Sequence, residues 1–134
     1  MESDFELFVP IKRKFNEDYG ISEKTEGFII EEFKDYLNNG TVIFAIVDEK
    51  IIGYLSGIIE DNKYERFGYI SEIFVSKDFR GKGVSTKLKD KFIEFLKSQK
   101  ISLCRIDVNP NNSALEIYEK WGFKIDKYRL YYKF

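Results

Sequence analysis

The sequence contains no histidine among its 134 residues and only one cysteine, Cys104. The absence of histidine removes the commonest general base, the Ser-His-Asp triad and most zinc sites. Any acid–base chemistry must therefore use carboxylates, tyrosine, lysine or water. A single cysteine excludes an internal disulfide and suits a reducing cytoplasm. Without histidine to activate it, Cys104 is expected to act as a small hydrophobic residue, not a nucleophile.

Strong net charge and long apolar runs are also missing. The net charge is −1, from 22 basic and 23 acidic residues, so no overall field favours nucleic acid. There is no run of eighteen apolar residues and no charged-then-apolar leader, which predicts neither a membrane span nor a signal peptide. These absences predict a cytoplasmic protein with no nucleic-acid, membrane or metal partner.

What is present is typical of one globular domain over residues 1–134. The chain is 43% apolar and 34% charged, the composition of a soluble protein with a well-charged surface. It has no internal repeat, low-complexity tract or linker. A length of 134 residues suits a single hydrophobic core.

Hydrophobic periodicity predicts an alternation of helices and strands. Helices are expected at 4–19, 24–38, 84–100 and about 113–121. Strands are expected at 42–47, 51–59, 67–75, 102–108 and 123–133. Pro10 is tolerable only in an early turn of the first helix. In the last helix, Ser113 and Glu116 form the pattern of a capping box, and Gly122 is the expected left-handed stop. The order predicts an α/β (α+β) fold of three layers, with a mixed sheet between helices.

The most informative segment is Arg80-Gly81-Lys82-Gly83-Val84-Ser85-Thr86, between the predicted strand 67–75 and the predicted helix 84–100. Backbone amides at a helix start bind anions, and glycines allow a phosphate to approach them closely. Arg80 and Lys82 add positive charge at the positive end of the helix dipole. The segment is therefore expected to hold a phosphate group.

Spacing excludes two familiar phosphate loops. A nucleotide-triphosphate loop needs two glycines five positions apart, followed by Lys and Ser or Thr, but Thr86 stands five positions after Gly81. A dinucleotide-binding fingerprint needs a third glycine where Thr86 stands.

A third pattern fits. Arg80-x-x-Gly83-x-Ser85 resembles the pyrophosphate loop Arg/Gln-x-x-Gly-x-Gly/Ala of the GNAT superfamily of N-acetyltransferases, with Ser85 in place of Gly or Ala. The segment 111–123 resembles the family's later motif, Asn-x-x-Ala-x-x-x-Tyr-x-x-x-Gly-Phe. The residues in register are Asn111, Ala114, Tyr118, Gly122 and Phe123. The two motifs have the family's order and spacing, and the resemblance covers roughly residues 41–134.

The resemblance implies a fold and a reaction. The fold is the GNAT core, a mixed, mostly antiparallel central sheet flanked by about four helices. The family usually opens with a strand, which is absent here or confined to residues 5–9. The reaction is transfer of an acetyl group from acetyl-coenzyme A to a primary amine, which attacks the thioester directly. The acceptor would be an amine-bearing small molecule or a peptide or protein N-terminus.

The resemblance also assigns residues to the cofactor. Amides of the loop would face the pyrophosphate, and the pantetheine arm would pair with a strand edge, where a main-chain amide would bind the thioester oxygen. The chain has one residue fewer than peptide-modifying members between Val108 and the motif asparagine, so either Asn111 or Asn112 fills that position. The expected cofactor-binding residues are Ile73, Phe74, Val75, Arg80, Gly81, Lys82, Gly83, Val84, Ser85, Thr86 and Asn111.

Three residues are candidates for catalysis. Tyr118 occupies the position of the family's general acid, which assists departure of the thiolate. Because the pKa of tyrosine is about 10 and that of a thiol about 8.5, full proton transfer would be uphill by about 2 kcal/mol. A hydrogen bond to the sulfur, or transfer from a tyrosine with a lowered pKa, is therefore expected. Glu72 and Asp107 are the two candidates for amine deprotonation, directly or through water. For each carboxylate, the alternative is a solvated charge at a strand end.

Two other functions are alternatives to acetyl transfer. A catalytically silent module that binds acyl-coenzyme A would use the same fold, and Ser85 and the short loop leave room for it. A nucleic-acid binder using Arg80-Gly81-Lys82 is disfavoured because the chain lacks a basic face and a stacking surface. The acceptor and the choice between monomer and homodimer are not readable from the sequence. Tyr128, Tyr131 and Tyr132 are expected to pack in the core or at an edge, with an acceptor pocket or dimer contact as alternatives.

Overall fold

The structure is a computed structural model that describes the backbone from Glu2 to Phe134 and the side chains from Asp4 onward. Met1 lies outside the described residues. The elements in chain order are α1 (Glu2–Asp18), α2 (Glu26–Asn39), β1 (Gly40–Val47), β2 (Lys50–Asp61), β3 (Arg66–Val75), the 3-10 turn η1 (Lys77–Phe79), α3 (Val84–Ser98), β4 (Cys104–Ile106) and α4 (Ala114–Lys120).

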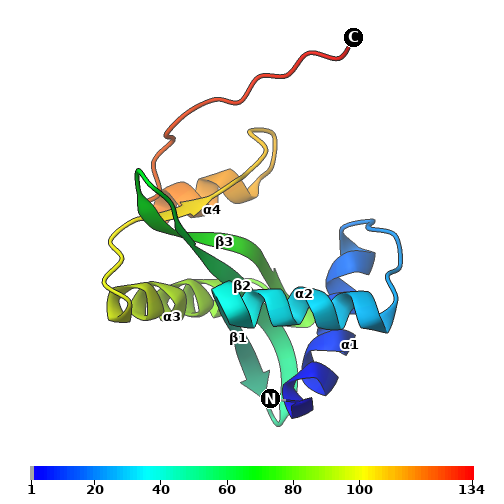
Figure 1. Cartoon of the computed structure of the whole chain (residues 1–134). Coiled ribbons are helices and arrows are strands. Elements are labelled where there is room, and N and C mark those ends of the chain that lie inside the picture. Colours follow the sequence, from blue (N-terminus) through cyan, green and yellow to red (C-terminus); the bar gives the residue numbers. More distant parts are fainter. Residues whose placement is uncertain (1) are drawn as a thin grey trace.

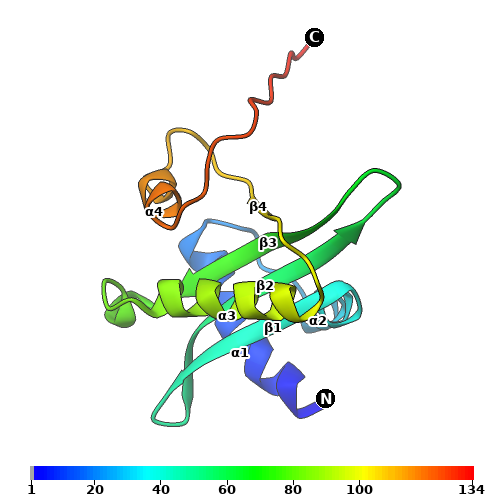
Figure 2. The ribbon, with the colours of Figure 1, turned by 90° about the vertical axis from the view of Figure 1, so that its left-hand side faces the viewer.

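The four strands form one mixed sheet in the order β1-β2-β3-β4. The pairs β1–β2 and β2–β3 are antiparallel, whereas β3–β4 is parallel. Helix α3 covers one face, and α1 and α2 cover the other (Figures 1 and 2). This arrangement confirms the predicted three layers and the mostly antiparallel sheet.

The core on the α3 face is built from one stripe of that helix. Leu88, Phe92 and Leu96 are buried at spacings of four residues and pack against sheet residues such as Leu55 and Ile70. Two glycines of the sheet make room for this stripe. A Cβ at Gly57 would lie 2.3 Å from the Phe92 ring, and one at Gly68 would lie 2.4 Å from the Leu96 methyl groups.

The core on the α1–α2 face is mainly aromatic. Phe8 and Phe33 pack with ring centroids 4.8 Å apart, and Phe8 meets Tyr54 of β2 edge-on at 5.4 Å. Burial of a side chain such as that of Phe8 stabilises the fold by about 1.5–3 kcal/mol. This is large enough to compete with local backbone preferences.

Helix α1 differs from the sequence prediction at its start. It begins at Glu2, so residues 5–9 are helical and no opening strand occurs among the described residues. Pro10 therefore lies inside the helix, beyond the early turn expected for it. A proline there costs about 3 kcal/mol. Burial of Phe8 and Ile11 on either side holds the helix in place despite this cost.

Strand β3 contains a bulge at Ser71. Glu72 pairs with Ser56 of β2, but Ile70 pairs with Gly57, so Ser71 has no partner in the ladder. A bulge turns two successive side chains to the same face of a sheet. Both Ser71 and Glu72 accordingly lie beside Tyr36 of α2.

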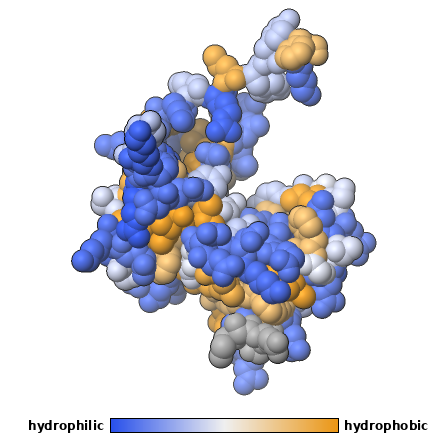
Figure 3. Space-filling view, in the orientation of Figure 1, coloured by the Kyte–Doolittle hydropathy of each residue, from blue (hydrophilic) through white to orange (hydrophobic). Residues whose placement is uncertain are grey.

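The C-terminal part departs furthest from the sequence prediction. The expected strand at 123–133 is wrong, because this segment is irregular and projects from the body of the molecule (Figures 1 and 3). A strand needs a hydrogen-bonding neighbour, and β4, predicted over 102–108, spans only Cys104–Ile106. Tyr128, Tyr131 and Tyr132 are exposed by 78%, 85% and 84%, so the expected core or edge packing is also wrong.

Helix α4 begins differently from the predicted capping box. Ser113 already has helical angles and makes no capping hydrogen bond, whereas an N-cap residue needs an extended conformation. Instead, the Asn112 side-chain oxygen accepts from the Ala114 amide at 2.9 Å. Gly122 ends the helix with φ +97°, which confirms the predicted left-handed stop.

Gly57→Ala is expected to destabilise the fold by about 1–3 kcal/mol, because the added Cβ overlaps the Phe92 ring. Urea unfolding measures the change. Gly27→Ala is the matched control, since nothing lies within 4 Å of a Cβ there and alanine favours the helix. Adding Phe92→Leu to Gly57→Ala should recover part of the loss. Equal stability of the two glycine variants would contradict this packing argument.

Candidate active site

The glycine loop has the backbone geometry of an anion site. Gly81 and Gly83 have φ values of +74° and +80°, and Gly83 is the N-cap of α3. Nothing lies within 4 Å of a Cβ added at either position, so the requirement for glycine comes from the backbone conformation. The space over both residues is open, which allows a ligand to reach the backbone.

The first amides of α3 have no side-chain cap, because a glycine stands at the N-cap. The first turn also contains no acidic residue. Lys82 is exposed and lies 5.6 Å from the Phe79 ring centroid. An uncapped helix start with a nearby lysine fits a bound phosphate.

The Arg80 side chain is fixed by contacts with other residues of the chain. Its Nε donates to the Val75 carbonyl at 2.8 Å, and its Nη2 pairs with Asp18 of α1 at 2.9 Å. The guanidinium also stands over the Phe74 ring, 5.6 Å from the centroid. The side chain therefore ties the start of the loop to β3 and α1.

The β4 side of β3 is open over its second half. The two strands pair only from Gly68 to Ile70, opposite Cys104 to Ile106. The Ser76 amide donates to Ile52 on β2 at 2.7 Å. Since backbone groups alternate between the two sides of a strand, those of Ile73 and Val75 face the open side. Arg80 occupies the Val75 carbonyl, which leaves the Val75 amide and both backbone groups of Ile73 for a ligand.

Tyr118 is coupled to the glycine loop through its neighbour Trp121. The two rings lie 5.4 Å apart, and Trp121 Nε1 donates to Thr86 Oγ1 in the first turn of α3 at 3.1 Å. Burial raises the pKa of Tyr118 above its usual value, and nearby Tyr19 at the end of α1 raises it further. The hydroxyl is therefore protonated at neutral pH and is a weaker acid than a free tyrosine. This finding contradicts the expected alternative of a lowered pKa.

Glu72 lies at the centre of a largely buried polar cluster. This corrects the alternative expectation that it is a solvated charge at a strand end. Its Oε2 is paired with the ammonium group of Lys12 on α1. Lys12 is only 4% exposed. Its Oε1 accepts from the Tyr36 hydroxyl at 3.0 Å. Glu32 lies 3.8 Å from the same Lys12 ammonium, so two carboxylates share one cation. Burial raises the pKa of Glu32.

Asp107 is exposed directly after β4. Its Oδ2 accepts from the Tyr69 hydroxyl of β3 at 3.0 Å. Burial and this hydrogen bond raise the pKa of Tyr69. Asp107 is thus in contact with solvent, directly after the point where the pairing of β3 with β4 ends.

Two asparagines precede α4 and differ in their contacts. The Asn112 side chain is used to cap the helix. Asn111 is exposed, and its backbone amide donates to Asn109 Oδ1 at 2.9 Å. Asn111 is therefore the one whose side chain remains available to a ligand.

The structure brings together the glycine loop, the open edge of β3 and the helix that carries Tyr118. It also adds Lys12 and Tyr36, which sequence reasoning did not select. A signal for Lys12 was present, because it falls four residues after Phe8 on the apolar stripe of α1. A charged residue within such a stripe indicates a buried partner.

Cys104 lies in an environment that does not favour a reactive thiol. Burial raises the pKa of Cys104 to about 11, which disfavours a thiolate. Among the side chains of residues 4–134, no cluster of three or more potential metal-ligating groups occurs. No helix in the same part of the chain has the length and apolar character needed to cross a membrane.

Lys12→Met is expected to cost about 3–5 kcal/mol, because it leaves the largely buried Glu72 carboxylate without its cation. Urea unfolding measures the loss. Lys14→Met, at an exposed position of the same helix, is the control and should change stability by less than about 0.5 kcal/mol. Adding Glu72→Gln to Lys12→Met should restore most of the stability. A double variant no more stable than Lys12→Met would show that the pair is not coupled.

Comparison with known proteins places these features in a family. The family model described as "Acetyltransferase (GNAT) family" matches residues 8–123. An N-alpha-acetyltransferase of Saccharolobus solfataricus is 30% identical over 108 residues, covering 72% of this chain and 63% of that protein. An uncharacterized N-acetyltransferase of Methanocaldococcus jannaschii is 41% identical over 56 residues, or 41% of this chain and 25% of that protein. The chain thus spans less than two thirds of the length of these relatives.

Solved structures share the fold at low sequence identity. An aminoglycoside acetyltransferase from an uncultured soil metagenomic sample has a TM-score of 0.79 at 20% identity, covering 99% of this chain and 91% of that one. A ribosomal-protein-alanine N-acetyltransferase from Brucella melitensis has a TM-score of 0.78 at 18% identity, covering 98% and 94%. From the match over residues 8–123, together with the loop and strand geometry, the chain belongs to the GNAT family of acetyltransferases, enzymes that use acetyl-coenzyme A.

Proposed function

We propose that the protein is an N-acetyltransferase that moves an acetyl group from acetyl-coenzyme A to a primary amine by direct attack. The observation that carries this proposal is the meeting of the open β3 edge with the uncapped start of α3, beside the helix of Tyr118. In the overall reaction, an ammonium group gains an acetyl group and loses two protons. One proton ends on the departing sulfur, and the other is released.

The chain has suitable groups for each part of the cofactor. The amides of Gly81–Thr86 would hold the pyrophosphate, with Lys82 as an added charge. The free backbone groups of Ile73 and Val75 would pair with the pantetheine arm as an added strand would. Asn111 would contact the same arm. When bound, the cofactor supplies an acetyl thioester.

Several cofactor-side residues would act through their backbone or through other residues. Phe74 and Val75 are buried, so only their backbone is available to a ligand. We assign Arg80 a positioning role, because its side chain is held by Asp18 and Val75. Val84, Ser85 and Thr86 supply first-turn amides of α3.

Tyr118 would donate a hydrogen bond to the departing sulfur. Its raised pKa keeps the proton on the phenol oxygen, and a hydrogen bond to developing negative charge stabilises the transition state without full transfer. Trp121 fixes the direction of this side chain, since its indole is bonded to Thr86 and its ring packs on Tyr118.

Two carboxylates remain candidates for accepting the amine proton. Both oxygens of Glu72 are engaged, by Lys12 and Tyr36, so Glu72 would act by attracting the ammonium or through a water. Asp107 has one oxygen bonded to Tyr69 and is open to solvent, so it can release a proton to water.

The occupied oxygens of Glu72 also support a second candidate, a module that binds acyl-coenzyme A without turnover. Isothermal titration with acetyl-coenzyme A, combined with a thiol-release assay over a panel of amines, separates the two. Tight binding without thiol release from any amine would support the binding module. Amine-dependent thiol release would support the enzyme.

Tyr118→Phe is expected to lower turnover at least about tenfold, as expected for loss of a hydrogen bond made in the transition state. The dissociation constant for acetyl-coenzyme A should stay nearly unchanged. Thiol release and isothermal titration measure the two quantities. Tyr128→Phe, at an exposed tyrosine outside the site, is the control. Full activity of Tyr118→Phe would remove Tyr118 from the mechanism.

Gly83→Glu is expected to abolish binding of acetyl-coenzyme A. The variant places a side chain in the open space over the loop, and its negative charge repels a pyrophosphate. Gly27→Glu adds the same charge at an exposed site on α2 and should bind normally. Thermal unfolding of both variants shows how much strain at φ +80° affects the fold. Retained affinity in a folded Gly83→Glu protein would refute the loop assignment.

A further inference from the structure

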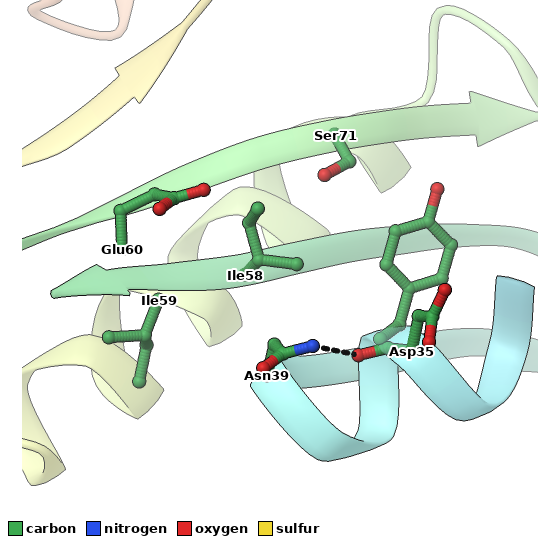
Figure 4. A pocket seen from close by; sticks show the side chains of 7 residues that line it. Asp35, Asn39, Ile58, Ile59, Glu60 and Ser71 are labelled. Carbon is green, nitrogen blue, oxygen red and sulfur yellow. Dashed lines mark hydrogen bonds between the residues drawn. The ribbon is translucent and has the colours of Figure 1, made fainter.

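A cavity opens on the α2 side of the sheet, next to the β3 bulge. Its volume is about 510 Å³, within the range of small-molecule sites. Figure 4 shows carboxylate, hydroxyl and aliphatic side chains around it, from α2, β2 and β3. The lining residues are Asp35, Tyr36, Asn39, Ile58, Ile59, Glu60 and Ser71.

The outer part of this cavity is negatively charged. Asp35 and Glu60 are exposed carboxylates from opposite walls, and neither takes part in an ion pair with another described residue. No basic side chain lines the cavity. Helix α2 ends at its wall, at Asn39, with no basic residue in the last turn. The carbonyl end of a helix carries partial negative charge, which adds to that of the two carboxylates.

The inner part of the cavity reaches the polar cluster around Glu72. Tyr36 lines the cavity, and its hydroxyl donates to Glu72 at 3.0 Å. Burial raises the pKa of Tyr36, and the Glu72 carboxylate raises it further.

The inner end of the cavity offers hydrogen-bond acceptors. The hydroxyl oxygens of Tyr36 and Ser71, which line the cavity, can each accept a bond from an N–H group. The charges here are also unbalanced, since Glu72 and Glu32 share the single Lys12 ammonium. A group that brings positive charge and several N–H donors would satisfy both needs.

The cavity lies close to the open edge of β3 along that strand. Ser71 lines it, and Ile73, two residues further along the strand, presents its backbone to the open side. Two residues of a strand span about 7 Å. An extended amine in the cavity would therefore place one end near this edge while its other end stays between Asp35 and Glu60.

We propose that this cavity binds the acceptor, and that the acceptor is a linear amine with at least two ammonium groups joined by an alkyl chain. One ammonium lies at the Tyr36–Glu72 end, and the second lies between Asp35 and Glu60. The alkyl chain lies along Ile58. The proposal rests on the proposed acetyl transfer for the fate of the first nitrogen, but the binding it describes can be measured without turnover.

The first experiment measures binding to the intact chain by isothermal titration at low ionic strength. The probes are 1,5-diaminopentane, 1-aminopentane and 5-aminopentanoate, which differ only at the far end. Affinity is expected to fall in that order, and the preference for the diamine should weaken at high salt. Equal affinity for the diamine and the monoamine, or no binding of either, would overturn the proposal.

Variants locate the second ammonium. Asp35→Asn and Glu60→Gln should each weaken diamine binding by about threefold to fivefold, the size expected for an exposed ion pair, and leave the monoamine unchanged. The double variant should lose at least about tenfold. Glu26→Gln removes a charge from the same helix outside the cavity and serves as the control. Equal loss for Glu26→Gln and Asp35→Asn would show only a general charge effect and would refute the site.

Thiol release from acetyl-coenzyme A distinguishes failure of this proposal from failure of the proposed function. Selective diamine binding without acetylation of any amine would leave the cavity assignment standing and refute the transferase. Acetylation of the monoamine and the diamine with equal kcat/KM would support the transferase and refute the cavity assignment. Faster acetylation of the diamine, lost in the Asp35→Asn and Glu60→Gln double variant, would support both.

Discussion

Backbone hydrogen bonding along β3 stops on one side after Ile70, and the candidate site depends on this change. From Gly68 to Ile70 the strand is paired on both sides, and beyond Ile70 only β2 remains as a partner. Unpaired backbone groups at a strand edge are a standing cost unless a ligand, water or another strand satisfies them. The cofactor side and the acceptor side of the proposed site both lie along this half-paired segment.

The surrounding elements fix the geometry of that open edge. Arg80 connects the end of β3 to the glycine loop and to α1. Trp121 connects α4 to the first turn of α3. On the α1–α2 face, the bulge at Ser71 turns Glu72 toward Lys12 and Tyr36. Each contact joins elements far apart in the sequence, so a small displacement of one would misplace the others.

Local patterns predicted most of the elements, and tertiary contacts explain the exceptions. The helix stripes and the hairpin were recoverable because burial on one face imposes a fixed period on the sequence. The rule that restricts Pro10 to an early turn takes no account of the buried packing of Phe8 and Ile11 on either side of it. Segment 123–133 alternates like a strand, but within the described residues it pairs with no other strand. Ser113 matches a capping pattern, but the side chain that caps the helix is that of Asn112.

The sequence by itself determined the glycine loop, the position of Tyr118 and the family, because these depend on residues close together in the chain. The loop conformation follows from the glycines at positions 81 and 83. The helical spacing of the later motif places Tyr118 one turn before the end of the helix at Gly122. Only the tertiary structure decided the state of the charged groups. Whether Glu72 is solvated or paired depends on Lys12, 60 positions away, and the proposed acceptor cavity is lined by residues of three separate elements. Burial and distance set electrostatic free energies, and neither is encoded in local sequence.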